Sequence, residues 1–309
     1  MSADTGGERS WPRVVGTALA ALVVAVAVAL GVSRYREDRA VDRLVATLLG
    51  GADDHVERTV GETDLSALPA PVERYVETVL EESSPRVPTA RIQQRGEVRL
   101  DGDWRPFSAV QHVAVDPPGF VWDADVEMAP GVGVRVVDRY VAGEGGLRAT
   151  LLSVLPVVEA PPEPSLSEAE LARYLAECVW LPTALLDERV EWEAIDDSTA
   201  RATIRDGERT ASLTFEFDDR GLVERVHADA RYRLDEDETA PWTGEFSEYR
   251  VRNGVLVPTE AEVRWDGEES YWRGTVESIA YGVEVTAGAS EPAEPPAESG
   301  EGAPAAADT

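Results

Sequence analysis

The sequence predicts an α+β fold in which a curved antiparallel sheet or incomplete β-barrel carries one helical insertion and follows a single transmembrane helix. An uncharged apolar run occupies residues 14–32, and alternation of apolar and polar residues begins near residue 91. Asp-Gly and Asn-Gly pairs then recur at short intervals, as at Asp101-Gly102 and Asn253-Gly254. Alternation between such turns is typical of antiparallel strands with one buried and one solvated face. We expect about ten or eleven strands between residues 90 and 284.

The apolar run 14–32 is the first expected element. It contains no charged residue, and about 20 such residues cross a bilayer as a helix. A cleaved signal peptide would have a shorter apolar region and a small-residue cleavage site, whereas this run leads directly into SRYREDR. We therefore expect an uncleaved single-pass anchor in the cell membrane. More Arg residues follow the run than precede it, which favours the cytoplasmic side for the sheet domain.

Two further helices are expected before the sheet. In residues 35–50, Val41, Leu44 and Leu48 fall on one face at helical spacing. Residues 68–82 place Pro71 in a first helical turn, where its missing N–H is tolerated. An apolar stripe follows, formed by Val72, Tyr75, Val76 and Val79.

A helical insertion is expected from residue 167 to about residue 186. Ser167 and Glu170 have the spacing of a capping box, which marks a helix start. Pro182 is expected to end or kink the helix. Apolar residues then recur on one face, at Leu171, Leu175 and Val179.

Two sequence segments indicate which strand residues are expected to face the core. In TASLTFEF the residues on one face are Ala211, Leu213, Phe215 and Phe217. In VHADARYRL they are Val226, Ala228, Ala230, Tyr232 and Leu234. The expected organisation is an N-terminal tail (1–13), the transmembrane helix (14–32), a connecting helix and linker (33–64), the sheet domain (65–285) and a disordered acidic Pro-rich tail (286–309).

Charge and composition exclude several functions. The 309 residues include 59 acidic and 29 basic side chains, for a formal net charge of −30. Nucleic-acid binding is not expected, because it needs a clustered basic surface. Such acidity suits a salt-loving host, where screening limits self-repulsion. One Cys and three scattered His predict no disulfide framework, no metal site and no cofactor.

The candidate ligand-binding residues are Trp122, Arg173, Glu177, Trp180 and Trp272. Arg173 and Glu177 lie four residues apart, so they share a helix face and can pair. Trp residues combine large apolar area with a polar N–H, as ligand walls often do. The alternative for Arg173 and Glu177 is a surface ion pair on a helix that packs across the sheet, and for the Trp residues it is ordinary core packing. We expect no catalytic residue. Cys178 fits an inert buried thiol better than a nucleophile.

Several phrases resemble an uncharacterised family catalogued as domain of unknown function 6544. The resemblance runs from about residue 68 to 281 and includes LPAPVERYV (68–76), DRYVAGEGGLRATLL (138–152), RYLAECVWLPTALL (173–186) and PWTGEFSEYR (241–250). The order of strands around one helical insertion is also similar to LolA-like lipoprotein carriers. That resemblance implies a curved sheet that holds acyl chains beneath helices.

The resulting functional hypothesis is a membrane-anchored, non-catalytic binding module for a lipid or other apolar ligand, held in a sheet cavity under the 167–186 helix. An envelope scaffold or protein-interaction domain is the alternative. A hydrolase that uses His112 with a carboxylate is a third possibility. A cavity under Trp180 would favour the ligand-binding module, and a filled core with an exposed apolar patch would favour the scaffold.

Overall fold

A computed structural model describes residues 11–52, 59–61, 65–81 and 84–283, without the side chains of residues 11–21 and 23. The predicted tail 286–309 lies outside these residues. The helical segments are α1 (Trp11–Leu49), α3 (Ala70–Val79), α4 (Pro164–Glu177) and the 3-10 turns η2 (Cys178–Trp180) and η3 (Pro182–Leu186). The strands are β1 (Thr89–Leu100), β2 (Asp103–Ala114), β3 (Gly119–Ala129), β4 (Val132–Val141), β5 (Glu144–Leu151), β6 (Leu155–Ala160), β7 (Val190–Ala194), β8 (Thr199–Asp206), β9 (Arg209–Phe217), β10 (Val223–Arg233), β11 (Glu238–Arg252), β12 (Val255–Trp265) and β13 (Trp272–Tyr281).

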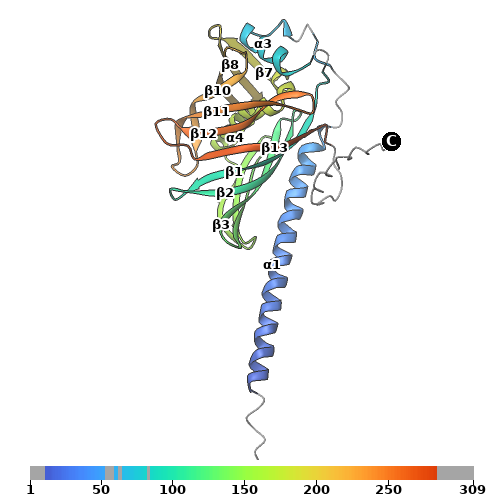
Figure 1. Ribbon diagram of the computed structural model, residues 1–309, viewed down its shortest axis with the longest axis vertical. Helices are drawn as coiled ribbons and strands as arrows, with labels where there is room; N and C mark the ends of the chain where they lie inside the picture. The colour runs from blue at the N-terminus through green and yellow to red at the C-terminus, as the bar shows by residue number, and fades with distance from the viewer. Residues whose placement is uncertain (1–10, 53–58, 62–64, 82–83, 284–309) are drawn as a thin grey trace, which may run out of the picture.

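In the described part of the chain the strands belong to one curved sheet, whose 13 strands exceed the expected ten or eleven. Strands β1 to β6 form one antiparallel meander and β7 to β13 form another. Pairing of β1 with β13 joins the two meanders. The helix α4 lies between them, against β9 and β10 on one side and β5, β4 and β3 on the other (Figure 1). The predicted curved sheet with a helical insertion is therefore confirmed as a half-barrel that wraps α4.

The hairpin turns follow the chemistry of their residues. Asp101 and Gly102 both have positive φ, at 52° and 88°. Asn253 and Gly254 also have positive φ, at 47° and 85°. Two consecutive residues with positive φ make the turn whose twist matches paired strands, and Asp-Gly and Asn-Gly tolerate it best. The turn pairs that predicted hairpins at these positions therefore form them.

The helices around the sheet agree with the sequence except at α4. The predicted stripe of α3, including Val72 and Tyr75, is buried. However, α4 begins at Pro164 and not at Ser167, so the predicted capping box is wrong. Pro164 provides the helix start because its φ suits a first turn. The Ser167 hydroxyl instead accepts the Gly145 backbone N–H at 3.0 Å, which ties the helix to β5.

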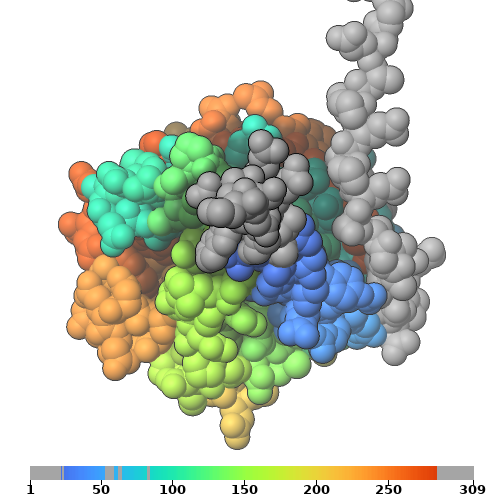
Figure 2. All heavy atoms as spheres, turned by 90° about the horizontal axis from the view of Figure 1, so that it is seen from below, coloured from blue at the N-terminus to red at the C-terminus, as the bar shows by residue number. Residues whose placement is uncertain are grey.

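The helix α1 packs its C-terminal part on the convex face of the sheet. Leu48 and Leu49 form a small core there with Val121, and the predicted stripe of Val41, Leu44 and Leu48 faces it. Figure 2 shows the blue helix lying directly against the green side of the sheet.

The predicted membrane localisation needs correction. Over the residues that the structure describes, no helix has both the length and the apolarity required to cross a bilayer. The prediction of a single-pass cell-membrane protein with its sheet domain on the cytoplasmic side is therefore wrong. Helix α1 does not end with the apolar run 14–32; it continues into charged residues such as Arg34 and Asp38, and Asp38 pairs with Arg135 of the sheet.

Candidate functional site

A polar cluster is buried where α4 crosses the concave face of the sheet. The Arg173 guanidinium donates from Nε to Glu177 at 2.9 Å and from Nη1 to Asp138 of β4 at 2.6 Å. Its Cζ lies 4.8 Å from the centre of the Phe120 ring and 5.2 Å from that of Trp122. The predicted Arg173–Glu177 pair therefore forms inside the molecule, because Asp138 and the two rings cover it. Burial acts to lower the Arg173 pKa, but the carboxylates of this cluster outweigh it and hold the guanidinium charged.

Two glutamines extend the cluster along the sheet. Gln111 Nε2 donates to Glu177 Oε2 at 2.6 Å, and Gln94 Nε2 donates to Gln111 Oε1 at 3.3 Å. The Trp122 indole N–H then donates to Gln94 Oε1 at 2.8 Å. Gln94 and Gln111 are fully buried, and this chain of hydrogen bonds explains how the fold tolerates them.

Arg231 enters the same cluster because β10 contains a bulge. The register with β11 shifts between Ala228 and Arg231, so the side-chain alternation reverses there. Ala230 is consequently exposed, contrary to the predicted alternation, and Arg231 turns toward α4. Its Nε donates to the Ala169 carbonyl at 3.1 Å, and its Nη2 lies 3.7 Å from Glu170 Oε1.

Glu170 is the least satisfied member of the cluster. Burial and then the Asp138 carboxylate raise its pKa from 4.5 to about 8, although Arg231 and Arg173 oppose the shift. The carboxyl group therefore holds its proton to higher pH than an exposed glutamate does. Among the described residues, Glu170 Oε2 and Asp138 Oδ1 are both buried without a hydrogen-bond partner.

An apolar floor lies beside the polar cluster on the same face of the sheet. Val98 of β1, Trp272 of β13 and Val263 of β12 are direct neighbours in the sheet register. All three are only partly buried and pack against the main core. Phe107 stacks on Trp272 with ring centres 5.6 Å apart, and it meets the Trp122 edge at 5.5 Å. A continuous row of rings therefore connects the half-open floor to Arg173.

Trp180 lies apart from this floor and its surroundings are filled. Its side chain is 2% exposed, its ring meets Phe246 edge-on at 6.0 Å, and its N–H donates to the Pro258 carbonyl at 3.0 Å. Trp122, Arg173 and Glu177 thus come together, Trp272 joins them through Phe107, and Trp180 belongs to the packed core. Nearby Cys178 is buried too, and burial raises the pKa of its thiol far above the usual value.

His112 occupies the opposite, convex face of the sheet. It is paired in register with Val121, whereas its neighbour Gln111 points inward. Burial and then Arg91 lower its pKa to about 4. Asp123, on the same face, is held by both Nε and Nη2 of Arg135 at 2.8 Å. Asp138 and Glu177, two other conceivable carboxylate partners, lie across the sheet from His112.

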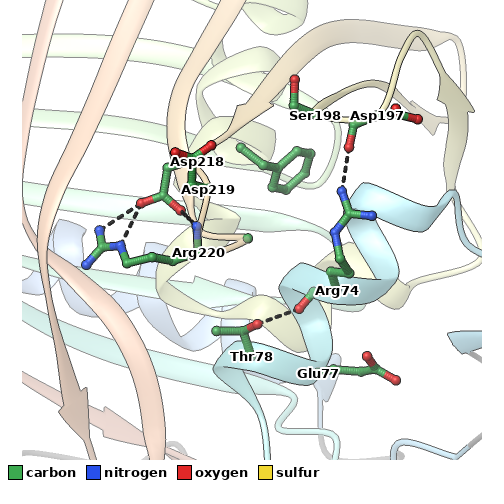
Figure 3. Close-up of a pocket in the computed structure, with 10 residues that line it drawn as sticks. Arg74, Glu77, Thr78, Asp197, Ser198, Asp218, Asp219 and Arg220 are labelled. Carbon is green, nitrogen blue, oxygen red and sulfur yellow. Dashed lines mark hydrogen bonds and ion pairs between the residues drawn. The ribbon is translucent and has the colours of Figure 1, made fainter.

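Two surface hollows are polar. One, of about 390 Å³, lies between α3 and the turns before β8 and β10. Figure 3 shows Arg74 bound to the Asp197 carbonyl and Arg220 paired with Asp218 at its rim. The other, of about 590 Å³, lies on the outer face of the sheet among Glu97, Glu245 and Arg273. Neither has the apolar lining that an apolar ligand requires.

The fold and the cluster together define an antiparallel half-barrel with a helix across its concave face. Residues 58–274 match the Family of unknown function (DUF6544), so the chain belongs to that family, as its sequence predicted. No curated protein matches the chain.

Some solved structures are similar to this chain at low sequence identity. A DUF1329 family protein from Desulfovibrio piger is 13% identical over 64% of this chain and 87% of that one, with a TM-score of 0.38. A putative outer membrane lipoprotein-sorting protein domain from Vibrio parahaemolyticus is 8% identical over 71% and 92%, with a TM-score of 0.39. A LolA superfamily protein from Nitrosomonas europaea is 12% identical over 68% and 90%, with a TM-score of 0.34.

Proposed function

We propose that this protein is a binding module for an apolar or amphiphilic ligand, held on the floor formed by Val98, Val263 and Trp272. The observation that carries this proposal is the half-open apolar surface inside a concave sheet. A contiguous apolar surface that is not fully covered marks a contact site. Apolar concave sites with a few convergent polar groups are typical of small-molecule binding.

The neighbouring polar cluster suits the head of an amphiphile. The row from Trp272 through Phe107 to Trp122 leads from the floor to Arg173. A guanidinium binds phosphate or carboxylate in a planar, bidentate manner. A ligand with an apolar chain on the floor and an anionic head near Arg173 fits this arrangement. Helix α4 covers Arg173, so this helix must move to let the head group reach it.

Binding of a dansyl-labelled fatty acid tests the proposal. Energy transfer from Trp272 and its neighbours to the dansyl group reports occupancy of the floor. Val263→Glu places a charge on the floor and should weaken binding by about tenfold or more, because one buried apolar side chain contributes ~1.5–3 kcal/mol. Val251→Glu is the matched control, since Val251 is 65% exposed and lies outside the floor.

This experiment shows whether the probe binds to the floor. Equal affinities of the Val263→Glu and Val251→Glu variants would show that the probe does not bind there. Native mass spectrometry of the wild-type protein, purified without detergent, then reveals whether a lipid is carried from the host.

A protein-interaction domain is the second candidate, favoured by a cluster of exposed apolar side chains. All but three of the exposed large apolar residues in the described chain lie on α1 between residues 22 and 35, at Val132, or between residues 152 and 158. Ser33 of α1 hydrogen-bonds to the Ser153 carbonyl, which brings these segments together. If this cluster joins copies of the chain, Leu155→Arg should lower the mass found by light scattering, and Val251→Arg should not.

A further inference from the structure

A guanidinium borders the apolar floor at one edge. Arg105 of β2 is the direct neighbour of Val98 in the sheet register, and Val98 in turn pairs with Trp272. Residues directly opposite each other on antiparallel strands share one face, so the Arg105 side chain leaves β2 on the floor side of the sheet. Phe107, two residues further along β2, lies on the same face and stacks on Trp272. The floor therefore continues through Val98 to a cationic side chain.

The resulting row of side chains has the length and the polarity of a single-chain amphiphile. Its members come from four neighbouring strands of the sheet: Val263 of β12, Trp272 of β13, Val98 of β1 and Arg105 of β2. Neighbouring strands lie about 4.8 Å apart, so the row spans about 14 Å. Three apolar side chains followed by a charged one match a ligand with an apolar chain and a polar head at one end.

Arg105 is accessible while α4 is in place. Its side chain is 33% exposed, compared with 17% for that of Arg173. Its Nη1 donates to the Met128 carbonyl at 3.3 Å, which holds the guanidinium beside β3. Its Nη2 pairs at 3.0 Å with Asp103, whose own side chain is 73% exposed. Such an exposed ion pair is weak, so a ligand can replace Asp103 at little cost.

The charge of this position favours a particular head group. One guanidinium carries one positive charge, and a carboxylate carries one negative charge in a planar form that matches the guanidinium. A phosphate monoester carries about 1.5 to 2 negative charges, so it would leave negative charge uncompensated beside Asp103. The formal net charge of −30 opposes any such addition. A fatty carboxylate therefore fits Arg105 better than an alkyl phosphate does.

We propose that Arg105 binds the carboxylate head of a single-chain amphiphile whose apolar chain lies on the floor, while α4 still covers Arg173. This inference rests on the proposed function, because it assigns a head-group contact of the same site. The ligand carboxylate takes the place of Asp103 in the pair with Arg105. Binding then needs no movement of α4, and the head reaches Arg173 only if the helix moves.

Two probes that differ only in the charge of the head test this assignment. One is a fatty acid with a dansyl group at the end of its chain, and the other is the neutral methyl ester of the same molecule. Arg105→Gln should weaken binding of the acid by about tenfold, because a hydrogen bond between charged groups is lost. The same variant should bind the ester as tightly as wild type does. Arg105→Lys keeps the charge but not the planar fork, and should recover part of the affinity for the acid.

Arg99→Gln is the matched control for Arg105→Gln. The Arg99 side chain is 32% exposed, and it also pairs with an exposed acid, Glu269. Arg99 follows Val98 in β1, so its side chain lies on the opposite face of the sheet. An equal loss of acid binding in the two variants overturns the inference. An equal loss of acid and ester binding in Arg105→Gln also overturns it, because Arg105 would then act through packing.

Removal of the competing carboxylate gives a test whose expected result misfolding cannot produce. Asp103→Asn should tighten binding of the acid by up to about fivefold, which is the largest contribution of an exposed ion pair. Glu269→Gln removes an acid with 78% exposure from Arg99 and should not change the affinity. Equally tighter binding in both variants would be a general effect of net charge and would overturn the inference.

Competition experiments separate the identity of the head from the binding function. Myristate should displace the acid probe at a lower concentration than tetradecyl phosphate, and this difference should disappear in Arg105→Gln. Stronger displacement by the phosphate overturns the assignment of a carboxylate. Equal wild-type affinities for acid and ester overturn the role of Arg105 but leave the floor as the binding site. A wild-type protein that binds neither probe overturns the proposed function and this inference with it.

Discussion

Arg173 connects the helix, the sheet and the aromatic row through one guanidinium. Its pairing with Asp138 and Glu177 occurs where both partners are mostly buried, with side-chain exposures of 9% and 16%. Removing one partner of a buried ion pair leaves an uncompensated charge and costs about 3–5 kcal/mol. An exposed pair is worth at most ~1 kcal/mol.

Arg173→Ala should therefore lower the free energy of unfolding by about 3–5 kcal/mol, as measured by urea denaturation at pH 7. Arg95→Ala is the control, because Arg95 pairs with Glu277 on the surface with 71% of its side chain exposed. Similar losses of unfolding free energy in the two variants would show that the ion pairs of Arg173 contribute no more than an exposed pair.

The pKa of His112 makes a separate prediction about acid stability. Burial and then Arg91 lower this pKa from 6.5 to about 4, so the folded state binds fewer protons than the unfolded state in that interval. Stability should be present above pH 6.5 and be lost as the pH falls toward 4. His112→Gln should remove this part of the pH dependence.

Nuclear magnetic resonance of the histidine ring checks the cause of that shift. Arg91→Gln removes the second contribution, so the His112 midpoint should move upward from about 4 toward 6.5. A midpoint that does not move would leave burial as its only cause.

The contact between α4 and β5 depends on a single glycine. A Cβ at Gly145 would lie 2.8 Å from the Ser167 Cα and 3.0 Å from the Leu166 carbonyl oxygen, so the helix would have to shift. Gly145→Ala should cost about 1–3 kcal/mol in unfolding free energy. A Cβ at Gly146 would meet only the flexible end of Arg139 and the Ala160 carbonyl, at 3.2 Å or more.

Gly146→Ala is therefore the matched control for this contact and should change stability little. Thermal unfolding of both variants distinguishes them. If Gly146→Ala is the more destabilising of the two, the helix does not rest on β5 as described.

At the scale of elements, the sequence predicted those features that depend only on residues close together in the chain. The Asp101-Gly102 and Asn253-Gly254 turns and the buried face of α3 follow from their own residues. The bulge in β10 does not, because it depends on the register with β11. Strict alternation along β10 therefore predicts Ala230 on the buried face and does not predict the inward turn of Arg231.

The candidate site was predictable in part for the same reason. Arg173 and Glu177 are one helical turn apart, so their pairing follows from spacing. Asp138 and Arg231 approach them only through the closure of the whole sheet around α4. Gln94 and Gln111 are polar residues in buried strand positions, a signal that could have suggested an internal hydrogen-bond network. Trp180 could not be assigned from the sequence, because apolar neighbours in the chain are expected both for a residue that lines a ligand site and for a residue in the packed core.

At the scale of the whole molecule, charge is the dominant feature. The formal net charge is −30, yet many acidic residues sit in ordered pairs on the sheet. On the outer face, Glu97 pairs with Arg273, Glu216 with Arg225 and Glu245 with Arg264. Salt weakens these attractions and the general repulsion alike. Because acids outnumber bases by 59 to 29, repulsion is the larger of the two.

The thermal midpoint should therefore rise when KCl is increased from about 0.1 M to 1 M, where the Debye length falls from roughly 10 Å to 3 Å. Screening is then nearly complete, so little further rise is expected above 1 M. A rise that continues in proportion to salt in the molar range would come from preferential exclusion of salt from apolar surface, which does not depend on net charge. A midpoint that does not change below 1 M would show that the ordered ion pairs offset the repulsion, and that the acidity is not an adaptation to salt.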